Sequence, residues 1–318
     1  MAIRPSLLRI ATRSSRLALT QARSVAALLA AGGIEAELVE VTTRGDTDRR
    51  PFGEIGGRGL FVAEVERAVL DGRADVAVHS AKDLTSVLDE RLAIVCVPPR
   101  ADPRDVVVGG RGTTGEERLA ALPAGARVGT SSLRRRALLA ELRPDLEVTE
   151  LRGNLDTRLA KVARGEADAA VLAAAGLDRL GAGAGAPLDP ARWVPAPGQG
   201  ALAVQALAGR SELAELFAPF DDPAARAALT LERAFAAALE GGCSVPLGCL
   251  AEGRAGQLVA TGYVGLPGGE HQVRDRISGP VSAAAALGAE LAAALRASGA
   301  DDILAELRAA AGPAPEPP

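Results

Sequence analysis

The sequence predicts an α/β fold made of two related lobes, followed by a smaller α+β region. Two stretches share one order of features: a short apolar strand, a Ser/Thr-rich turn, and an amphipathic helix that ends at Gly or Pro. They are "LRIATRSSRLALTQARSVAALLAAGG" from Leu8 and "ARVGTSSLRRRALLAELRPDL" from Ala126. Residues 72–84 ("GRADVAVHSAKDL") resemble residues 165–177 ("GEADAAVLAAAGL") at a constant offset. Alternating strands and helices are typical of α/β lobes, whose ligands bind at the carboxyl ends of the strands.

In the first lobe, the strand at Leu8 leads into a helix that we expect to end at Gly32 and Gly33, because Ser/Thr cap helix starts and Gly marks their ends. The next clear strand covers residues 76–78 and ends at His79. Between them, residues 46–61 are polar and Gly-rich, which is typical of either a lid or a solvated linker.

In the second lobe, the helix after Thr-Ser-Ser is expected to stop at Pro144. The "GAGAGA" run at residues 181–186 does not fit the GxGxxG dinucleotide pattern and is interpreted as a connector.

The third region starts with a helix from about Pro223. "QLVATGYVGL" and "HQVRDRISG" then alternate apolar and polar residues, which predicts a small antiparallel sheet. An alanine-rich helix is expected from Val281 to about Ala297, and the final "GPAPEPP" is interpreted as a frayed tail.

The composition of the chain disfavours nucleic-acid binding, secretion and membrane insertion. The 318 residues carry a net charge of −4 and only 2% aromatic side chains, which disfavours a nucleic-acid surface. The start of the chain lacks the apolar core of a signal peptide, and charges or Gly interrupt every long apolar run. We therefore expect a soluble, cytoplasmic protein without membrane contact.

Cysteine and histidine are scarce. Three cysteines without CxxC spacing make disulfides unexpected, and His79 and His271 lie too far apart in the sequence to suggest a metal site. Cys96 lies in an apolar strand and is interpreted as a core residue, whereas Cys249 fits either a core or a loop position.

Arginines gather at predicted helix starts. Arg134, Arg135 and Arg136 stand in the first turn of a helix, where the helix dipole is already positive. Free backbone N–H groups and cations together favour an anion, and the planar guanidinium suits carboxylate or phosphate. Arg13 and Arg16 occupy the equivalent helix start in the first lobe. A row of solvated surface arginines is the alternative.

Lys82 and Asp83 follow directly after the strand that ends at His79. At the mouth of a strand they could act as an acid–base pair, and Lys82 could form a Schiff base. An exposed ion pair at a helix start is equally compatible with the pattern. His79 is interpreted as a core histidine.

Cys243 stands in "LEGGCSVPLG", a stretch whose glycines and proline favour an open loop. A loop thiol can be a nucleophile, a redox sensor or an attachment point. No base lies nearby in the sequence to activate a nucleophile, whereas attachment requires only access.

These pieces together resemble the hydroxymethylbilane synthase (porphobilinogen deaminase) family over nearly the whole chain. The motifs that carry the resemblance occur in the expected order: "RIATRSSRLAL", "TTRGD", "GGRGLF", "ADVAVHSAKDL", "DPRDVVV", "VGTSSLRRRALL", "LRGNLDTRL", "AGLDRLG", "PAPGQGALAV" and "LEGGCSVPLG". The resemblance implies two periplasmic-binding-protein-like lobes beside a small C-terminal α+β domain. It also implies domain limits at 1–102 plus 200–220, at 103–199 and at 221–318.

The resemblance further implies a reaction and a cofactor. Four porphobilinogen molecules lose ammonia and are joined head to tail on a dipyrromethane cofactor, which a thioether attaches to Cys243. The linear tetrapyrrole is then released by water. No metal and no nucleic-acid partner is implied, and a monomer is expected.

By match to the family motifs, Asp83 is the catalytic residue, stabilising cationic pyrroles and relaying protons. The implied cofactor ligands are Lys82, Thr130, Ser131, Ser132, Arg134, Arg135 and Arg158. The implied substrate and chain-binding residues are Arg13, Ser15, Arg152, Arg179, Gln21 and Gln199.

The chain departs from the family pattern at two positions. Thr85 replaces the usual Pro two residues after Asp83, which frees a backbone N–H and loosens the turn. Arg58 replaces Lys in the proposed lid at 46–58. Two rival hypotheses are a non-catalytic two-lobed anion-binding protein and a transferase that uses the Cys243 thiol with His79 or Lys82.

Overall fold

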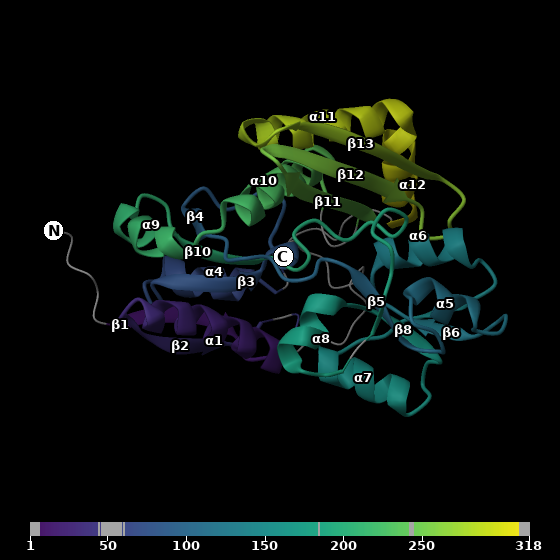
Figure 1. Cartoon of the computed structure of the whole chain (residues 1–318), viewed down its shortest axis with the longest axis horizontal. Helices are drawn as coiled ribbons and strands as arrows, with labels where there is room; N and C mark the ends of the chain where they lie inside the picture. The colour runs from purple at the N-terminus through teal and green to yellow at the C-terminus, as the bar shows by residue number, and fades with distance from the viewer. Residues whose placement is uncertain are drawn as a thin grey trace.

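The computed structural model describes residues 7–43, 45, 59, 61–183, 185–241 and 245–311. These residues form two five-stranded sheets and one three-stranded sheet, each covered by helices (Figure 1). The first sheet is drawn in purple, blue and green, the second mainly in teal, and the third in green and yellow. Cys243 and the segment 46–58 lie outside the described residues.

The first sheet has the strand order β2-β1-β3-β10-β4. β1, β2 and β3 are parallel, and β10 runs antiparallel between β3 and β4. Alternate residues of a strand face opposite sides, so Ile10 packs under α1 and α9 while Ala11 packs against α4. The strands are β1 (Leu7–Arg13), β2 (Glu35–Val41), β3 (Val76–Ser80), β4 (Leu92–Cys96) and β10 (Leu202–Leu207), and the helices are α1 (Arg16–Ala31), α4 (Ala63–Leu70) and α9 (Ser211–Phe217).

The second sheet repeats this arrangement in the order β7-β6-β8-β5-β9. β7, β6 and β8 are parallel, and β5 is antiparallel to β8. Its core has one layer under α5 and α6 and another under α7 and α8. The strands are β5 (Asp105–Gly109), β6 (Arg127–Gly129), β7 (Glu147–Thr149), β8 (Ala169–Ala173) and β9 (Ala186–Pro187), and the helices are α5 (Gly115–Ala120), α6 (Leu133–Leu142), α7 (Leu155–Ala163) and α8 (Ala174–Leu180).

The predicted repeat is confirmed, because β3 and β8 hold the same place in their sheets and differ by the offset seen in the sequence. The chain crosses between the sheets twice, at residues 97–104 and 188–201. β10 therefore belongs to the first sheet although it follows the second in sequence. The connector predicted at 181–186 needs a small correction, since Ala186 pairs with Val107 as part of β9.

The helix starts follow the local chemistry expected from the sequence. The Ser15 side chain accepts a hydrogen bond from the Ala18 amide of α1, and the Ser132 side chain accepts one from the Arg135 amide of α6, each at 3.4 Å. α1 ends at Ala31 with Gly32 as its C-cap, and α6 ends at Leu142, before Pro144. Both helices therefore begin at the carboxyl ends of β1 and β6, where the parallel strands of each sheet end.

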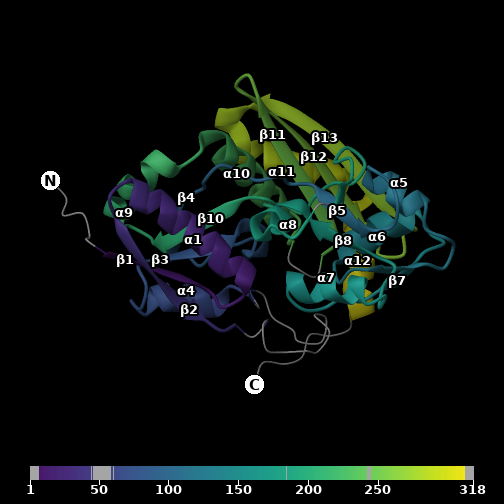
Figure 2. The same ribbon diagram turned by 60° about the horizontal axis from the view of Figure 1, so that its bottom comes forward.

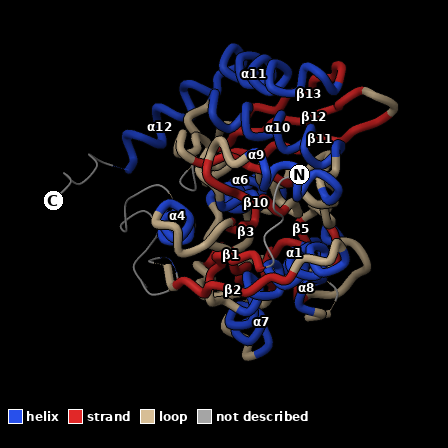
Figure 3. The backbone as a smooth tube through the Cα atoms, turned by 90° about the vertical axis from the view of Figure 1, so that its left-hand side faces the viewer, coloured by secondary structure: helices blue, strands red, loops and turns tan. Residues whose placement is uncertain are grey.

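The C-terminal part packs two helices on one face of an antiparallel sheet, β11-β12-β13 (Figure 3). The sheet has a strand that sequence patterning missed, β11 (Leu247–Arg254), beside the expected β12 (Gln257–Gly265) and β13 (Gln272–Pro280). β11 was missed because its first five residues are all buried and do not alternate. The helices that pack on the sheet are α10 (Pro223–Ala238) and α11 (Ala284–Leu295).

The predicted helix from Val281 is shorter than expected. α11 ends at Leu295, and Gly299 with φ of 107° separates it from α12 (Asp301–Ala311). Within Val281–Ala310, an 18-residue window reaches a mean hydropathy of 1.2, so by length and composition alone this stretch could span a membrane. However, Leu287, Leu291 and Leu295 belong to the core that α11 shares with α10. α11 therefore buries one apolar face in the core of the C-terminal part, while 33% of the candidate window as a whole is buried.

The three parts contact one another directly. α1 of the first lobe lies beside α8 of the second, with Leu17 near Gly176 (Figure 2). Tyr263 of β12 is inserted into the core of the second lobe beside Trp193. α10 packs its Ala225 and Leu229 against Leu84, next to the end of β3. The residues after β3 therefore lie where the first lobe and the C-terminal part meet.

Candidate functional site

Positively charged side chains from both lobes converge at the carboxyl ends of the parallel strands. Arg158 interacts electrostatically with Arg135, Asp83, Arg152 and Arg13, and burial followed by repulsion from Arg135 lowers its pKa to about 10. Arg13 ends β1 and Asp83 follows β3, whereas the other three belong to the second lobe. The cationic cluster, as we name it, consists of Arg13, Lys82, Arg134, Arg135, Arg152 and Arg158.

Asp105, the first residue of β5, is the buried counter-ion of this cluster. Its carboxylate accepts hydrogen bonds from Arg134 Nη2 at 2.8 Å and from Arg135 Nη2 at 2.7 Å. Trp193 Nε1 and Gln199 Nε2 also donate to it, at 2.7 and 2.9 Å. Burial alone would raise the pKa of Asp105, but the two arginines outweigh it and hold the pKa well below its usual value.

The environment of Arg134 and Arg135 differs from the sequence expectation. They were expected as open cations at a helix start, but both are buried, at 3% and 6% exposure. Their remaining Nη1 atoms donate to the backbone oxygens of Val194 and Val171, at 2.8 and 2.9 Å. The dipole argument was correct in requiring an anion. The sequence argument did not identify this anion. It is the carboxylate of Asp105, which lies in the "DPRDVVV" motif, about thirty residues before the two arginines.

Some polar atoms of this buried group have no hydrogen-bond partner among the described residues. They are Arg134 Nε, Arg135 Nε and Gln199 Oε1. Because buried polar atoms are normally paired, these three are available to a bound polar group or water.

Lys82 and Asp83 form a short 3-10 turn, Ala81–Asp83, directly after β3. The turn is held by a hydrogen bond from the Ala81 amide to Ala201 O at 3.0 Å. Burial lowers the pKa of Lys82 to about 8, with Asp83 opposing that shift and Arg135 adding to it. An amine with a pKa of about 8 is mostly protonated at pH 7, and an anion bound beside it would raise that pKa again.

His79 lies under this turn and is buried, as expected for a core histidine. Burial lowers the pKa of His79 to about 4, so the imidazole is neutral near pH 7. Its Nε2 atom has no partner among the described residues.

The other arginines of the cluster are held by contacts within their own lobes. Arg152 Nε donates to Glu150 at 2.6 Å, and Arg158 Nε donates to Gly153 O at 2.8 Å. The Arg13 guanidinium lies over the Phe61 ring, 4.3 Å from its centre. Outside the cluster, Arg179 of α8 donates to Gly200 O in the second crossover at 2.8 Å, and burial lowers its pKa.

The predicted hydroxyl and amide ligands each make a hydrogen bond within the protein. Ser131 donates to Leu151 O at 2.8 Å, and the Thr130 hydroxyl accepts from the Ser132 amide at 3.2 Å. Ser15 caps α1, and Gln21 donates to the Ser80 hydroxyl at 2.8 Å. Gln199 was expected to line a cleft, but it is fully buried and braces Asp105 instead.

The two described cysteines are core residues. Cys96 is fully buried, as predicted, and burial raises the pKa of its thiol to about 12. Cys249, left open from sequence, is also fully buried within β11. Neither is an accessible thiol. Among the residues with a described placement, no His, Cys, Asp or Glu cluster could hold a metal ion.

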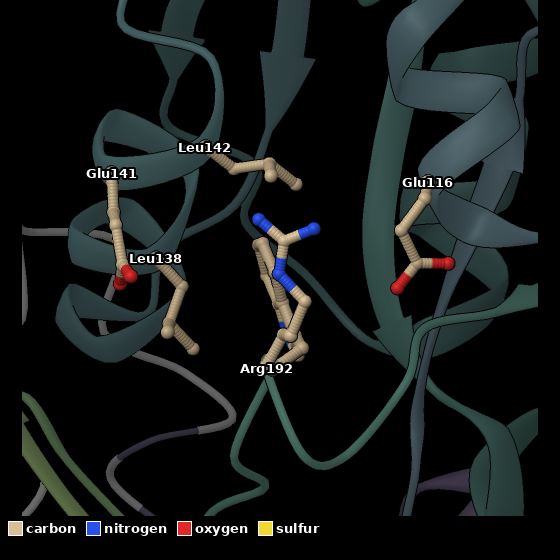
Figure 4. A pocket seen from close by; sticks show the side chains of 6 residues that line it. Glu116, Leu138, Glu141, Leu142 and Arg192 are labelled. Carbon is tan, nitrogen blue, oxygen red and sulfur yellow. The ribbon is translucent and has the colours of Figure 1, made fainter. Parts of the chain in front are cut away.

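A small cavity on the second lobe lies apart from the cationic cluster. Figure 4 shows the Arg192 side chain between Leu142 and Glu116, with Glu141 and Leu138 on the α6 side. Its volume of ≈ 20 Å³ accommodates little more than one water molecule. It is therefore not a candidate substrate site.

Two family models match the chain. Residues 8–215 match the model described as "Porphobilinogen deaminase, dipyromethane cofactor binding domain", and residues 227–297 match "Porphobilinogen deaminase, C-terminal domain". Among solved structures, the periplasmic aliphatic sulphonate binding protein SsuA from Escherichia coli is only remotely similar. It has a TM-score of 0.38 at 18% identity, over 74% of this chain and 70% of that chain.

Curated relatives are much more similar. The porphobilinogen deaminase of Roseiflexus castenholzii is 49% identical over 94% of this chain and 98% of that protein. The enzymes named porphobilinogen deaminase from Stenotrophomonas maltophilia and Paraburkholderia phytofirmans are 48% and 47% identical, over 93% and 98% of this chain and 98% and 92% of those proteins. Since both family models and these relatives together span most of its length, the chain belongs to the porphobilinogen deaminase family.

Proposed function

We propose that this protein is a hydroxymethylbilane synthase. It joins four porphobilinogen molecules head to tail with loss of ammonia and releases the linear tetrapyrrole. The observation that carries the proposal is the cationic cluster beside Asp83, within a chain whose family is shown. Porphobilinogen is a dicarboxylate, so each added unit brings two more negative charges to the site.

The residues of the site fit a dipyrromethane cofactor. Such a group carries several carboxylates, and the described cations of the cluster outnumber Asp83, Asp105 and Glu150, the carboxylates that interact with them. The unpartnered Arg134 Nε and Arg135 Nε supply donors in the buried part. When bound, the cofactor supplies the pyrrole carbon to which the first substrate unit is joined.

We assign the binding residues by the family motifs and their positions around the cluster. The proposed cofactor ligands are Lys82, Thr130, Ser131, Ser132, Arg134, Arg135 and Arg158, with attachment through the Cys243 thiol. The proposed substrate and chain ligands are Arg13, Ser15, Arg152, Arg179 and Gln21. Gln199 is reassigned to the support of Asp105, because its amide is buried against that carboxylate.

Asp83 is the proposed catalytic residue. Its carboxylate interacts electrostatically with Lys82 and with Arg158. An ionised carboxylate at the mouth of β3 can stabilise positive charge on a pyrrole and accept a pyrrole proton.

We also propose three domains, 1–102 plus 200–220, 103–199 and 221–318. The strand order of the sheets supports this division, because β10 pairs with β3 and β4. The two crossovers would act as hinges that widen the site for a growing chain. A cytoplasmic monomer without nucleic-acid or membrane partners completes the proposal.

Intact mass and ammonia release test this function. The denatured wild-type protein should carry a covalent dipyrrole that is absent from Cys243→Ser, and porphobilinogen should be consumed with release of ammonia. A non-catalytic two-lobed binding protein would bind porphobilinogen without releasing ammonia. An active wild-type protein with an unmodified mass would contradict attachment at Cys243.

The variant Asp83→Asn tests the catalytic assignment. It keeps the shape of the side chain but removes the charge, so we expect cofactor loading to persist while turnover falls by roughly 100-fold or more. Mass spectrometry reports loading, and single-turnover kinetics report chemistry. Near-normal turnover by Asp83→Asn would show that Asp83 is not the catalytic residue.

A further inference from the structure

We infer that Arg233 of α10 is a positioning residue that holds the turn carrying Asp83. This inference rests on the catalytic role proposed for Asp83. Arg233 lies outside the cationic cluster and, among the residues that the structure describes, makes no hydrogen bond to any of its members. Its function is therefore not explained by anion binding.

The contact is made with the backbone directly after the Asp83 turn. Arg233 Nη2 donates to Thr85 O at 3.0 Å and to Ser86 O at 3.2 Å. Thr85 is two residues from Asp83, and Leu84 between them is buried against Ala225 and Leu229 of the same helix. α10 thus holds this loop by one buried side chain and by two hydrogen bonds from a charged donor.

The surroundings of Arg233 stabilise the charge of its guanidinium. It is half-buried, burial lowers its pKa, and Glu66 of α4 partly opposes that effect. A buried cation is costly unless polar groups surround it, so the two carbonyl oxygens and Glu66 stabilise the guanidinium in return. The contact therefore stabilises both partners.

Thr85 stands where the family usually has proline, so this loop lacks the backbone restraint that a proline would give. We infer that the hydrogen bonds from Arg233 replace that restraint. A proline would fix the backbone at this position, whereas Thr85 leaves it free to rotate. The Thr85 hydroxyl does donate to Val87 O at 2.6 Å, but that bond is exposed and local. Arg233 supplies the long-range restraint from α10, the helix that precedes Cys243 in the sequence.

The residue before Thr85 has an extended backbone that a following proline tolerates. Leu84 has φ of −63° and ψ of 143°, which lies in the region that a residue before proline prefers. A proline at 85 should therefore restrain the same turn by a different physical means. This gives the inference a rescue test.

The test compares Arg233→Met, Arg233→Met with Thr85→Pro, and Arg226→Met in the cofactor-loaded enzyme. Methionine keeps an apolar stem and removes the guanidinium. Arg226 is the matched control because it lies on the same helix and lines the same cavity of ≈ 260 Å³, but it binds the Asp221 carboxylate and, more weakly, Ile94 O. Amide exchange of residues 84–88, cofactor loading by mass, and kcat and KM are measured for each.

For Arg233→Met we expect normal loading, roughly tenfold faster amide exchange at 84–88 and a roughly tenfold lower kcat, because a charged hydrogen bond and precise placement of Asp83 are lost. Thr85→Pro should recover most of both losses. Arg226→Met should lower stability without changing exchange at 84–88.

The inference is overturned if Arg233→Met leaves exchange at 84–88 unchanged, or if Arg226→Met affects it equally. It is also overturned if proline restores nothing. If Arg233→Met does not fold, Arg233→Lys provides the same test with a donor that reaches fewer acceptors, and unchanged exchange in that variant counts against the clamp. Exchange is independent of porphobilinogen turnover, so a failure of the clamp is distinguishable from a failure of the proposed function.

Discussion

At the scale of single residues, the site depends on how charge is balanced in a buried place. Arg134 and Arg135 stand at a helix start, where the dipole opposes them, and Asp105 compensates both. Each arginine is fixed by one carboxylate oxygen and one backbone oxygen, so neither guanidinium can rotate freely. The cofactor ligands proposed here are therefore ordered before any anion arrives.

Asp105→Asn should strongly destabilise the protein. Removing one partner of a buried ion pair leaves uncompensated charge, which typically costs about 3–5 kcal/mol. Glu166→Gln is the control, because the exposed pair with Arg164 should contribute less than about 1 kcal/mol. Urea denaturation measures both, and equal losses would show that Asp105 is not a special counter-ion.

Lys82 predicts a pH dependence of ligand binding. Folding lowers its pKa from 10.5 to about 8, so the folded protein loses this proton between pH 7 and 9 while an unfolded chain keeps it. Folding stability therefore rises with pH from about 8 to 10.5, whereas affinity for an anion falls, because only the ammonium attracts it.

The expected change is up to about tenfold weaker binding of porphobilinogen from pH 7 to pH 9, as a group with a pKa near 8 loses its charge. Calorimetry on the cofactor-free Cys243→Ser variant measures this change. Adding Lys82→Met should flatten the profile. A pH-independent affinity in the presence of Lys82 would refute the assignment.

At the scale of elements, the Asp83 turn is held by close backbone packing. Gly198 has φ of +74°, and a Cβ placed there would lie 2.9 Å from the Lys82 amide nitrogen. The second crossover therefore packs on the turn at a distance that only glycine permits. Together with the Arg233 contact, this approach restrains the turn from two directions.

Gly198→Ala should lower both stability and turnover. Positive φ alone costs an alanine roughly 1–2 kcal/mol, and the displaced turn should reduce kcat by roughly tenfold or more. Gly72→Ala is the control, since Gly72 has φ of +70° but nothing within 4 Å of the added Cβ. The control should change only the melting temperature. Equal kcat values for the two variants would contradict the packing explanation.

At the scale of the whole molecule, one buried carboxylate joins all three parts. Glu232 of α10 accepts hydrogen bonds from both terminal nitrogens of Arg100 in the first crossover, at 2.6 and 3.0 Å. It also accepts from the Gly198 amide in the second crossover at 2.6 Å and from the Ala251 amide of β11 at 2.9 Å. The lobes and the C-terminal part are therefore coupled through the crossovers.

Glu232→Gln should weaken this coupling. The amide cannot compensate Arg100 and cannot accept all four bonds, so we expect a loss of about 3–5 kcal/mol. Calorimetry should also show a broader or divided transition, because the C-terminal part can unfold separately. Glu290→Gln, at an exposed position, should stay within about 0.5 kcal/mol of the wild type. A single unshifted transition in Glu232→Gln would contradict this account.

The sequence by itself determined the local features of this protein. Helix caps at Ser15 and Ser132, the repeated order of strand and helix, and the cations beside strand ends are encoded by residues close together in the chain. The β3 and β8 repeat could be predicted for the same reason. The core positions of Cys96 and His79 also followed from their apolar neighbours.

The tertiary structure alone decided which distant groups meet. Asp105 pairs with arginines about thirty residues away, Tyr263 enters the core of another lobe, and Arg233 reaches the turn after Asp83. Such contacts bring together residues far apart in sequence, and no periodicity or cap motif records them. β11 escaped prediction for a related reason, since tertiary burial of both faces removed the alternation that reveals a strand.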